Sequence, residues 1–185
     1  MELAIGLPLI IMMLWAMSNL FAGTWKECRD LIADFTMQIE VNNAMQRIVS
    51  DLNVASYADK IKRGTSGAYN DQLEIKNYIV SGSDIILSDK SLPESKKPIY
   101  YGVYNPEGSD GRKSLYRQRQ LVKNAQGYNH PITGDDLLSL VNIKKFDFEP
   151  QNDEQPWIIT IEAESKISNH RYELRTKVFL GGADR

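Results

Sequence analysis

The residues that could support catalysis or metal binding are few and widely separated. The chain contains two histidines, His130 and His170, and one cysteine, Cys28. Neither histidine stands at a spacing typical of a zinc site or of a Ser-His-Asp triad. The sequence also contains no glycine-rich phosphate-binding loop. We therefore expect a protein that is not an enzyme, with no catalytic residue, no cofactor and no bound metal.

Two groups of acidic residues could be considered as calcium ligands, because calcium binds clustered oxygen atoms. They are the pair Asp135 and Asp136, and the group Asp147, Glu149, Asp153 and Glu154. Neither group has the fixed ligand spacing of a known calcium-binding loop. The sequence therefore gives a calcium site little support.

Charge and cysteine content narrow the classes of protein further. The 185 residues carry a formal net charge of -2 and a sequence pI near 5.7. Such a chain has no basic field that would collect nucleic acid or an anionic lipid surface, so we expect no nucleic-acid partner. Cys28 cannot form a disulfide within the chain. Its place among apolar residues predicts a small buried side chain, with a reactive thiol as the alternative.

The first sixty residues, approximately, form a nearly unbroken helical pattern that organises the rest of the chain. From Leu3 to Ala22 the residues are apolar apart from Ser18 and Asn19, and no charge interrupts them. A helix of this length just spans the hydrocarbon layer of a bilayer, which is about 30 Å thick. We therefore expect residues 1–23 to be the transmembrane half of a long helix.

Beyond Gly23 the pattern becomes amphipathic, with apolar residues at three- and four-residue spacing. The members of this predicted stripe are Cys28, Leu31, Ile32, Phe35, Ile39, Met45, Ile48, Val49 and Leu52. If both parts form one helix from about Leu3 to about Ala58, it is roughly 80 Å long. A cleaved signal peptide is the alternative for the start, but the sequence lacks a basic n-region and a good cleavage site. The nearby basic residues, Lys26 and Arg29, leave the topology open.

The rest of the chain is typical of short strands separated by polar loops. Strands are predicted over residues 73–80, 84–87, 98–104, 115–122 and 143–149, with a short helical turn between 133 and 141. The segment Asn105–Gly111 is a strong turn signal, which predicts a hairpin between the strands on either side of it.

The last two predicted strands show the clearest alternation. Apolar side chains share one face from Trp157 to Ala163 and again from Tyr172 to Leu180, while the opposite faces carry acidic and basic residues that can pair. A sheet with one apolar face needs a cover, which the amphipathic half of the helix offers. We predict an α+β fold with a transmembrane helix half (1–23), an amphipathic spine helix (24–62) and an antiparallel β-rich head (63–185).

This order of elements resembles the type IV pilins and pseudopilins. The opening MELAIGL is similar to that family's mature N-terminus from its fourth residue onward. Other segments resemble the J-type minor pseudopilins of type II secretion. They are AMQRIVSDL (44–52), LYRQRQ (115–120), the leucine pair, valine and FDF of 137–148, and PWII (156–159). The resemblance covers most of the chain and implies a pilin-like fold.

The resemblance also implies a function in assembly. It suggests a minor pseudopilin, a structural subunit near the tip of the pseudopilus of a type II secretion system. Such a protein crosses the inner membrane once and carries an extracytoplasmic head. Its partners are the other minor pseudopilins, the major pseudopilin and the inner-membrane assembly platform. Two alternatives stay open: a minor pilin of a type IV or competence pilus, and a membrane-anchored binding domain that does not polymerise.

Four residues carry the implied roles. Glu2 is the counterpart of the family's acidic residue, which pairs with the N-terminal amine of a neighbouring subunit during assembly; a carboxylate resting at the water interface is the alternative. Pro8 lacks an N–H group and could kink the membrane helix. Arg117 and Arg119 alternate on a predicted strand, as a solvated face or as a possible subunit contact. We expect the family's basic leader, ending in glycine before a phenylalanine, upstream of Met1.

Overall fold

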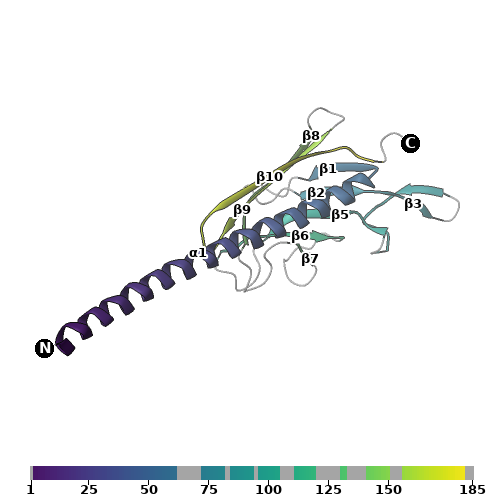
Figure 1. Ribbon diagram of the computed structural model, residues 1–185. Coiled ribbons are helices and arrows are strands. Elements are labelled where there is room, and N and C mark those ends of the chain that lie inside the picture. The colour runs from purple at the N-terminus through teal and green to yellow at the C-terminus, as the bar shows by residue number, and fades with distance from the viewer. Residues whose placement is uncertain are drawn as a thin grey trace.

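The computed structural model describes residues 2–61, 72–81, 84–93, 96–104, 111–119, 130–132, 141–150 and 156–181. One long helix leads into a head built from antiparallel strands, and the first half of the helix projects away from the head as a bare rod (Figure 1). The predicted α+β layout is confirmed.

Helix α1 runs from Glu2 to Asn53 without a break and contains 52 residues, so it is about 78 Å long. It is rich in Leu, Met and Ala, which are strong helix formers. The helix continues across Pro8 and across Gly23, so the apolar and amphipathic parts belong to one element. Its end comes earlier than the predicted Ala58.

The end of α1 is fixed by two hydrogen bonds. The carbonyl of Leu52 accepts from the N–H groups of Ala55, at 3.0 Å, and Gly181, at 3.4 Å, and so one of the unpaired carbonyls at the helix end is satisfied. The chain then enters strand β1, Tyr57–Ile61, which pairs with strand β2. The prediction of helix to residue 62 is wrong over these residues, because pairing with a neighbouring strand overrides local preference.

Five strands form one antiparallel sheet in the order β1-β2-β5-β6-β7. The strands after β1 are β2 (Gln72–Lys76), β5 (Ile99–Tyr104), β6 (Ser114–Gln118) and the short β7 (His130–Pro131). The predicted hairpin across residues 105–111 is confirmed, since β5 and β6 pair with Tyr101 opposite Arg117.

A second antiparallel sheet has the order β10-β9-β8. Its strands are β8 (Val141–Pro150), β9 (Trp157–Ser165) and β10 (Arg171–Val178). A separate two-stranded sheet contains β3 (Tyr78–Ser81) and β4 (Asp84–Leu87). The predicted strand over 73–80 is therefore two strands that separate at Asn77. Of the predicted helical turn between 133 and 141, residues 133–140 lie outside the described residues, and Val141 begins strand β8 instead.

The second half of α1 packs on the sheets and forms one core with them (Figure 1). The helix contributes Met37, Val41, Ala44, Met45, Ile48 and Leu52. The predicted apolar face of β9 is confirmed, because Trp157, Ile159, Ile161 and Ala163 are all buried. Each large side chain buried in this way contributes about 1.5 to 3 kcal/mol, and their sum anchors the head to the helix.

Candidate functional site

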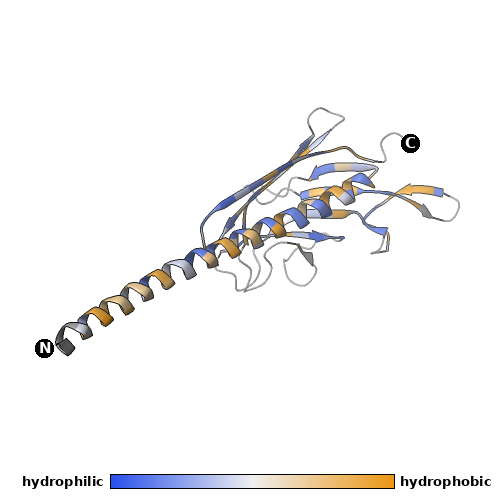
Figure 2. Ribbon diagram, viewed as in Figure 1, coloured by the Kyte–Doolittle hydropathy of each residue, from blue (hydrophilic) through white to orange (hydrophobic). Residues whose placement is uncertain are grey.

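The first half of α1 exposes apolar side chains on all sides. Every side chain from Leu7 to Arg29 is exposed, and the exposed fractions of Trp15 and Phe21 reach 71% and 74%. Figure 2 shows this half of the rod largely in the hydrophobic colours. So much apolar surface is unfavourable in water and favourable in lipid. The helix is long and apolar enough to cross a membrane.

Four large apolar side chains continue this exposed surface beyond the charged residues Lys26–Asp30. They are Leu31, Ile32, Phe35 and Ile39, which we call the outer stripe, and their exposed fractions are 57, 64, 64 and 58%. Their spacing places them on one side of the helix. The buried residues Ala33, Met37 and Val41 lie on the opposite side of the helix, against the head.

The outer stripe ends at Ile39. On the next turns the same side of α1 carries Asn43, Gln46 and Ser50, which are polar and exposed. The distance along the axis from Gly23 to Ile39 is about 24 Å. A bilayer that covers the first twenty residues or so does not reach the outer stripe.

The prediction that the apolar stripe from Cys28 to Leu52 is buried is wrong at its N-terminal end. Cys28 is exposed, and so are all four residues of the outer stripe, whereas Met45, Ile48 and Leu52 are buried as predicted. The reason is that α1 carries two apolar faces. The small residues Ala33 and Ala44 mark the face that the head covers, and they are the sequence signal that separates the two.

Arg117 reaches α1 from strand β6 of the five-stranded sheet. Its Nε lies 2.8 Å from Oδ2 of Asp51 and 3.2 Å from the hydroxyl of Tyr101, and that hydroxyl also contacts Asp51. The side chains of Arg117 and Asp51 are 17% and 13% exposed. Burial, and next the contact with Asp51, raise the pKa of Tyr101. This network connects the helix to the sheet.

Arg119 lies one residue beyond the end of β6 and donates to the carbonyl of Lys97 at 3.4 Å. Arg117 therefore contacts α1 and β5, whereas Arg119 contacts the segment just before β5. A role for either arginine in subunit contact stays a prediction. Glu2 is the first residue of α1 and Pro8 lies inside the helix; the side chain of Glu2 lies outside the described residues, and the roles predicted for both also stay predictions.

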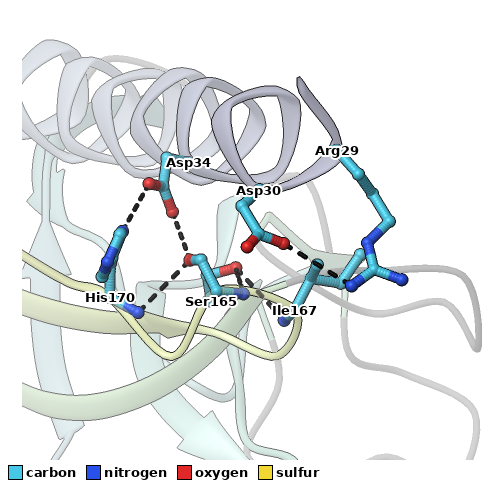
Figure 3. Close-up of polar contacts among 7 residues, drawn as sticks. Arg29, Asp30, Asp34, Ser165, Ile167 and His170 are labelled. Atoms are coloured by element: carbon cyan, nitrogen blue, oxygen red, sulfur yellow. Dashed lines mark hydrogen bonds and ion pairs between the residues drawn. The ribbon is translucent and has the colours of Figure 1, made fainter. Parts of the chain in front are cut away.

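A second polar connection joins α1 to the β9–β10 turn, residues 165–170 (Figure 3). Oδ2 of Asp34 lies 2.7 Å from Nδ1 of His170, and Oδ1 accepts a hydrogen bond from the hydroxyl of Ser168. On the two strands joined by this turn, Arg171 of β10 contacts Glu162 at 3.4 Å and Glu164 at 3.3 Å, both on β9. The predicted charge pairing across this hairpin is confirmed.

The structure brings together no metal site in the part of the chain that it describes, since no group of three potential ligands is close enough to hold an ion. Asp147 and Glu149 lie on β8, where Nζ of Lys60 is 3.7 Å and 3.8 Å from their carboxylates. The other candidates fall outside the described residues, namely Asp135, Asp136, Asp153, Glu154 and the side chain of His130.

Comparison with protein-family models, with curated proteins and with solved structures gives no match for this chain. The fold and the surface of α1 nevertheless define a class. The chain is an α+β protein in which one N-terminal helix, long and apolar enough to cross a membrane, also supports an antiparallel β head.

Proposed function

We propose that this chain is a minor pseudopilin, a structural subunit of the pseudopilus of a type II secretion system with a pilin-like fold. In this role the first half of α1 anchors the subunit in the inner membrane, with the head on the extracytoplasmic side. Assembly then transfers the apolar rod from lipid to contacts with neighbouring subunits. The partners are the other minor pseudopilins, the major pseudopilin and the assembly platform.

The observation that carries this proposal is the outer stripe. A protein that only needs a membrane anchor has no use for large apolar side chains that lie outside the lipid and on the side opposite its own head. Leu31, Ile32, Phe35 and Ile39 are more than half exposed in the single chain. They offer an apolar ridge to a helix of another subunit, packed side by side with α1.

The proposal gives a role to each of the residues predicted to act in assembly. Glu2 pairs with the N-terminal amine of the neighbouring subunit and sets its axial position. Pro8 allows the membrane half of α1 to bend as the subunit leaves the bilayer. Arg117 pairs with Asp51 of α1 and Arg119 donates to the carbonyl of Lys97, and either arginine could add a contact with another subunit.

The experiment uses Cys28, which is exposed and lies on the same side of α1 as Ile32 and Phe35. A maleimide photo-cross-linker attached to this single cysteine, in membranes of cells that make the secretion system, should yield adducts with other pseudopilins. The variant Phe35→Lys places a charge in the proposed helix contact. We expect it to lower the yield of adducts about tenfold or more, which corresponds to about 1.4 kcal/mol.

The matched control is Gln46→Lys, which adds the same charge on the same side of α1, C-terminal to the outer stripe. It should leave the adducts unchanged. If Phe35→Lys behaves like this control, the outer stripe is not an assembly surface and a non-polymerising anchored domain is favoured. Loss of extracellular enzyme secretion in the Phe35→Lys strain favours a secretion pseudopilus, and loss of pili or DNA uptake favours a type IV or competence pilus.

A further inference from the structure

The carboxylate of Asp34 attaches the β9–β10 turn to α1 (Figure 3). One oxygen lies 2.7 Å from Nδ1 of His170 and the other accepts from the hydroxyl of Ser168. Asp34 is 18% exposed and the imidazole of His170 is 68% exposed. Solvent protons therefore reach this contact directly at the histidine.

The turn presents His170 to the helix in a defined position. Ser165 is fully buried, and its hydroxyl accepts from the N–H groups of Ile167 and Ser168 at 3.3 Å each. Its own N–H donates to the carbonyl of His170 at 2.9 Å. Asn169 has φ of 58°, a left-handed conformation that asparagine tolerates better than most residues. Little additional ordering is needed for the imidazole to meet Asp34.

The contact lies at the boundary between the covered and the bare parts of α1. Ala33, the neighbour of Asp34, is fully buried, whereas every side chain from Leu7 to Arg29 is exposed. C-terminal to this point, core contacts of α1 from Met37 to Leu52 hold the head on the helix. Release of the turn would therefore free the lower edge of the head from the rod without detaching the head.

We propose that the contact between Asp34 and His170 is a pH-dependent latch, which holds the β9–β10 turn on α1 while the imidazole is charged and loosens when the imidazole is neutral. The latch is a property of the single chain. It does not depend on assembly into a fibre.

The direction of the pH dependence follows from the two partners. The hydrogen bond to Asp34 and the charge of that carboxylate raise the pKa of His170 above its ordinary value, and the charge of Asp30 adds a smaller rise. Partial burial raises the pKa of Asp34, but hydrogen bonds from Ser168 and His170 outweigh it and lower that pKa. Stabilisation by His170 is thus complete below pH about 6.5 and is lost as the pH rises through its raised pKa. Stabilisation by Asp34 is lost only in strong acid.

The other charged groups around the latch are carboxylates, lysines and arginines from α1, the strands and the turn. On α1, Asp30 lies one turn before Asp34 and pairs with Arg29 at 3.6 Å. On the strands, Arg171 pairs with Glu162 and Glu164, and Lys144 lies 2.5 Å from Glu164. Lys166 is exposed on the turn itself. Carboxylates, lysine and arginine do not ordinarily titrate between pH 5 and 8, so His170 sets the response.

Two NMR measurements on the full chain in detergent micelles test the latch. The first is the pKa of His170 from its imidazole shifts. The second is the hydrogen-exchange protection of the Asn169 and His170 amides at pH 6 and pH 8.5, after correction for intrinsic exchange. We expect a pKa above the ordinary histidine value, and protection that falls about two- to fivefold at the higher pH, as for a partly exposed ion pair.

Three variants separate the latch from general effects of pH. His170→Asn cannot titrate in this range and should show the same protection at both pH values. Asp34→Asn should lower the pKa of His170 toward its ordinary value, because only the charge of Asp30 then still raises it. His130→Asn removes the other histidine and should behave like the wild type. Equal loss of protection in wild type and His170→Asn, or an unchanged His170 pKa in Asp34→Asn, would overturn the proposal.

Discussion

At the scale of single residues, one connection between helix and sheet is polar. Asp51, Arg117 and Tyr101 come from α1, β6 and β5, and the two charged side chains are less than one fifth exposed. Such a pair adds little over apolar packing when complete, but it is costly to break, because the remaining charge is left desolvated. The network therefore fixes where α1 meets the sheet.

Replacement of Arg117 by alanine should lower the free energy of unfolding by about 2 to 4 kcal/mol, since Asp51 loses its charged partner and stays largely buried. Thermal or denaturant unfolding of the full chain in one detergent measures this change. Arg47→Ala is the matched control, because Arg47 is exposed on α1 close to Arg117. It should change stability by no more than about 0.5 kcal/mol. Equal effects of the two variants would mean that the Asp51 contact contributes nothing specific.

At the scale of the element, α1 has two apolar faces with different partners. One face, from Ala33 to Leu52, is buried against the head. The other, the outer stripe, faces away from it. Identical residue types occur on both, so their separate contributions can be compared directly in one helix.

Ile48→Ala and Ile32→Ala form a matched pair for this comparison. Ile48 is fully buried and Ile32 is 64% exposed. In the single chain, Ile48→Ala should destabilise the head by about 2 to 4 kcal/mol, while Ile32→Ala should change stability by no more than about 0.5 kcal/mol. Unfolding in detergent gives both values. If the outer stripe serves assembly, Cys28 cross-linking should be reduced by Ile32→Ala without any loss of folding; a large stability loss in that variant would place Ile32 in the core instead.

At the scale of the whole molecule, the rod and the head are energetically separate. Among the described residues, the buried core begins at Ala33 on α1 and includes nothing before it. The first half of the helix therefore adds little to the stability of the head, which depends on the second half.

Deletion of residues 1–23 should leave the head folded, with a melting temperature within a few degrees of the full chain in the same buffer. Circular dichroism and the dispersion of amide NMR signals measure this. The exposed outer stripe should make the shortened chain self-associate, and Phe35→Lys should reduce that association. Loss of tertiary structure on deletion would show that the rod supports the head after all.

The sequence by itself determined the layout and most of the elements, although not the end of α1 or the strand β1 that follows it. A run of apolar residues from Leu3 to Ala22 and the alternation from Trp157 to Ala163 are local patterns, and the period of a pattern reports its secondary structure. The hairpin across Asn105–Gly111 follows from turn chemistry in the same way. These predictions depend only on residues that are close together in the sequence, and not on tertiary contacts.

Only the tertiary structure decided which surfaces meet. Spacing shows that Ile32 and Ile48 both belong to apolar positions of a helix, but not that the head covers one and leaves the other exposed. Likewise, Asp34 and His170 are 136 residues apart in the chain, and no local pattern links them. Burial and pairing at long range depend on how α1 and the sheets pack against each other, which is a property of the folded chain as a whole.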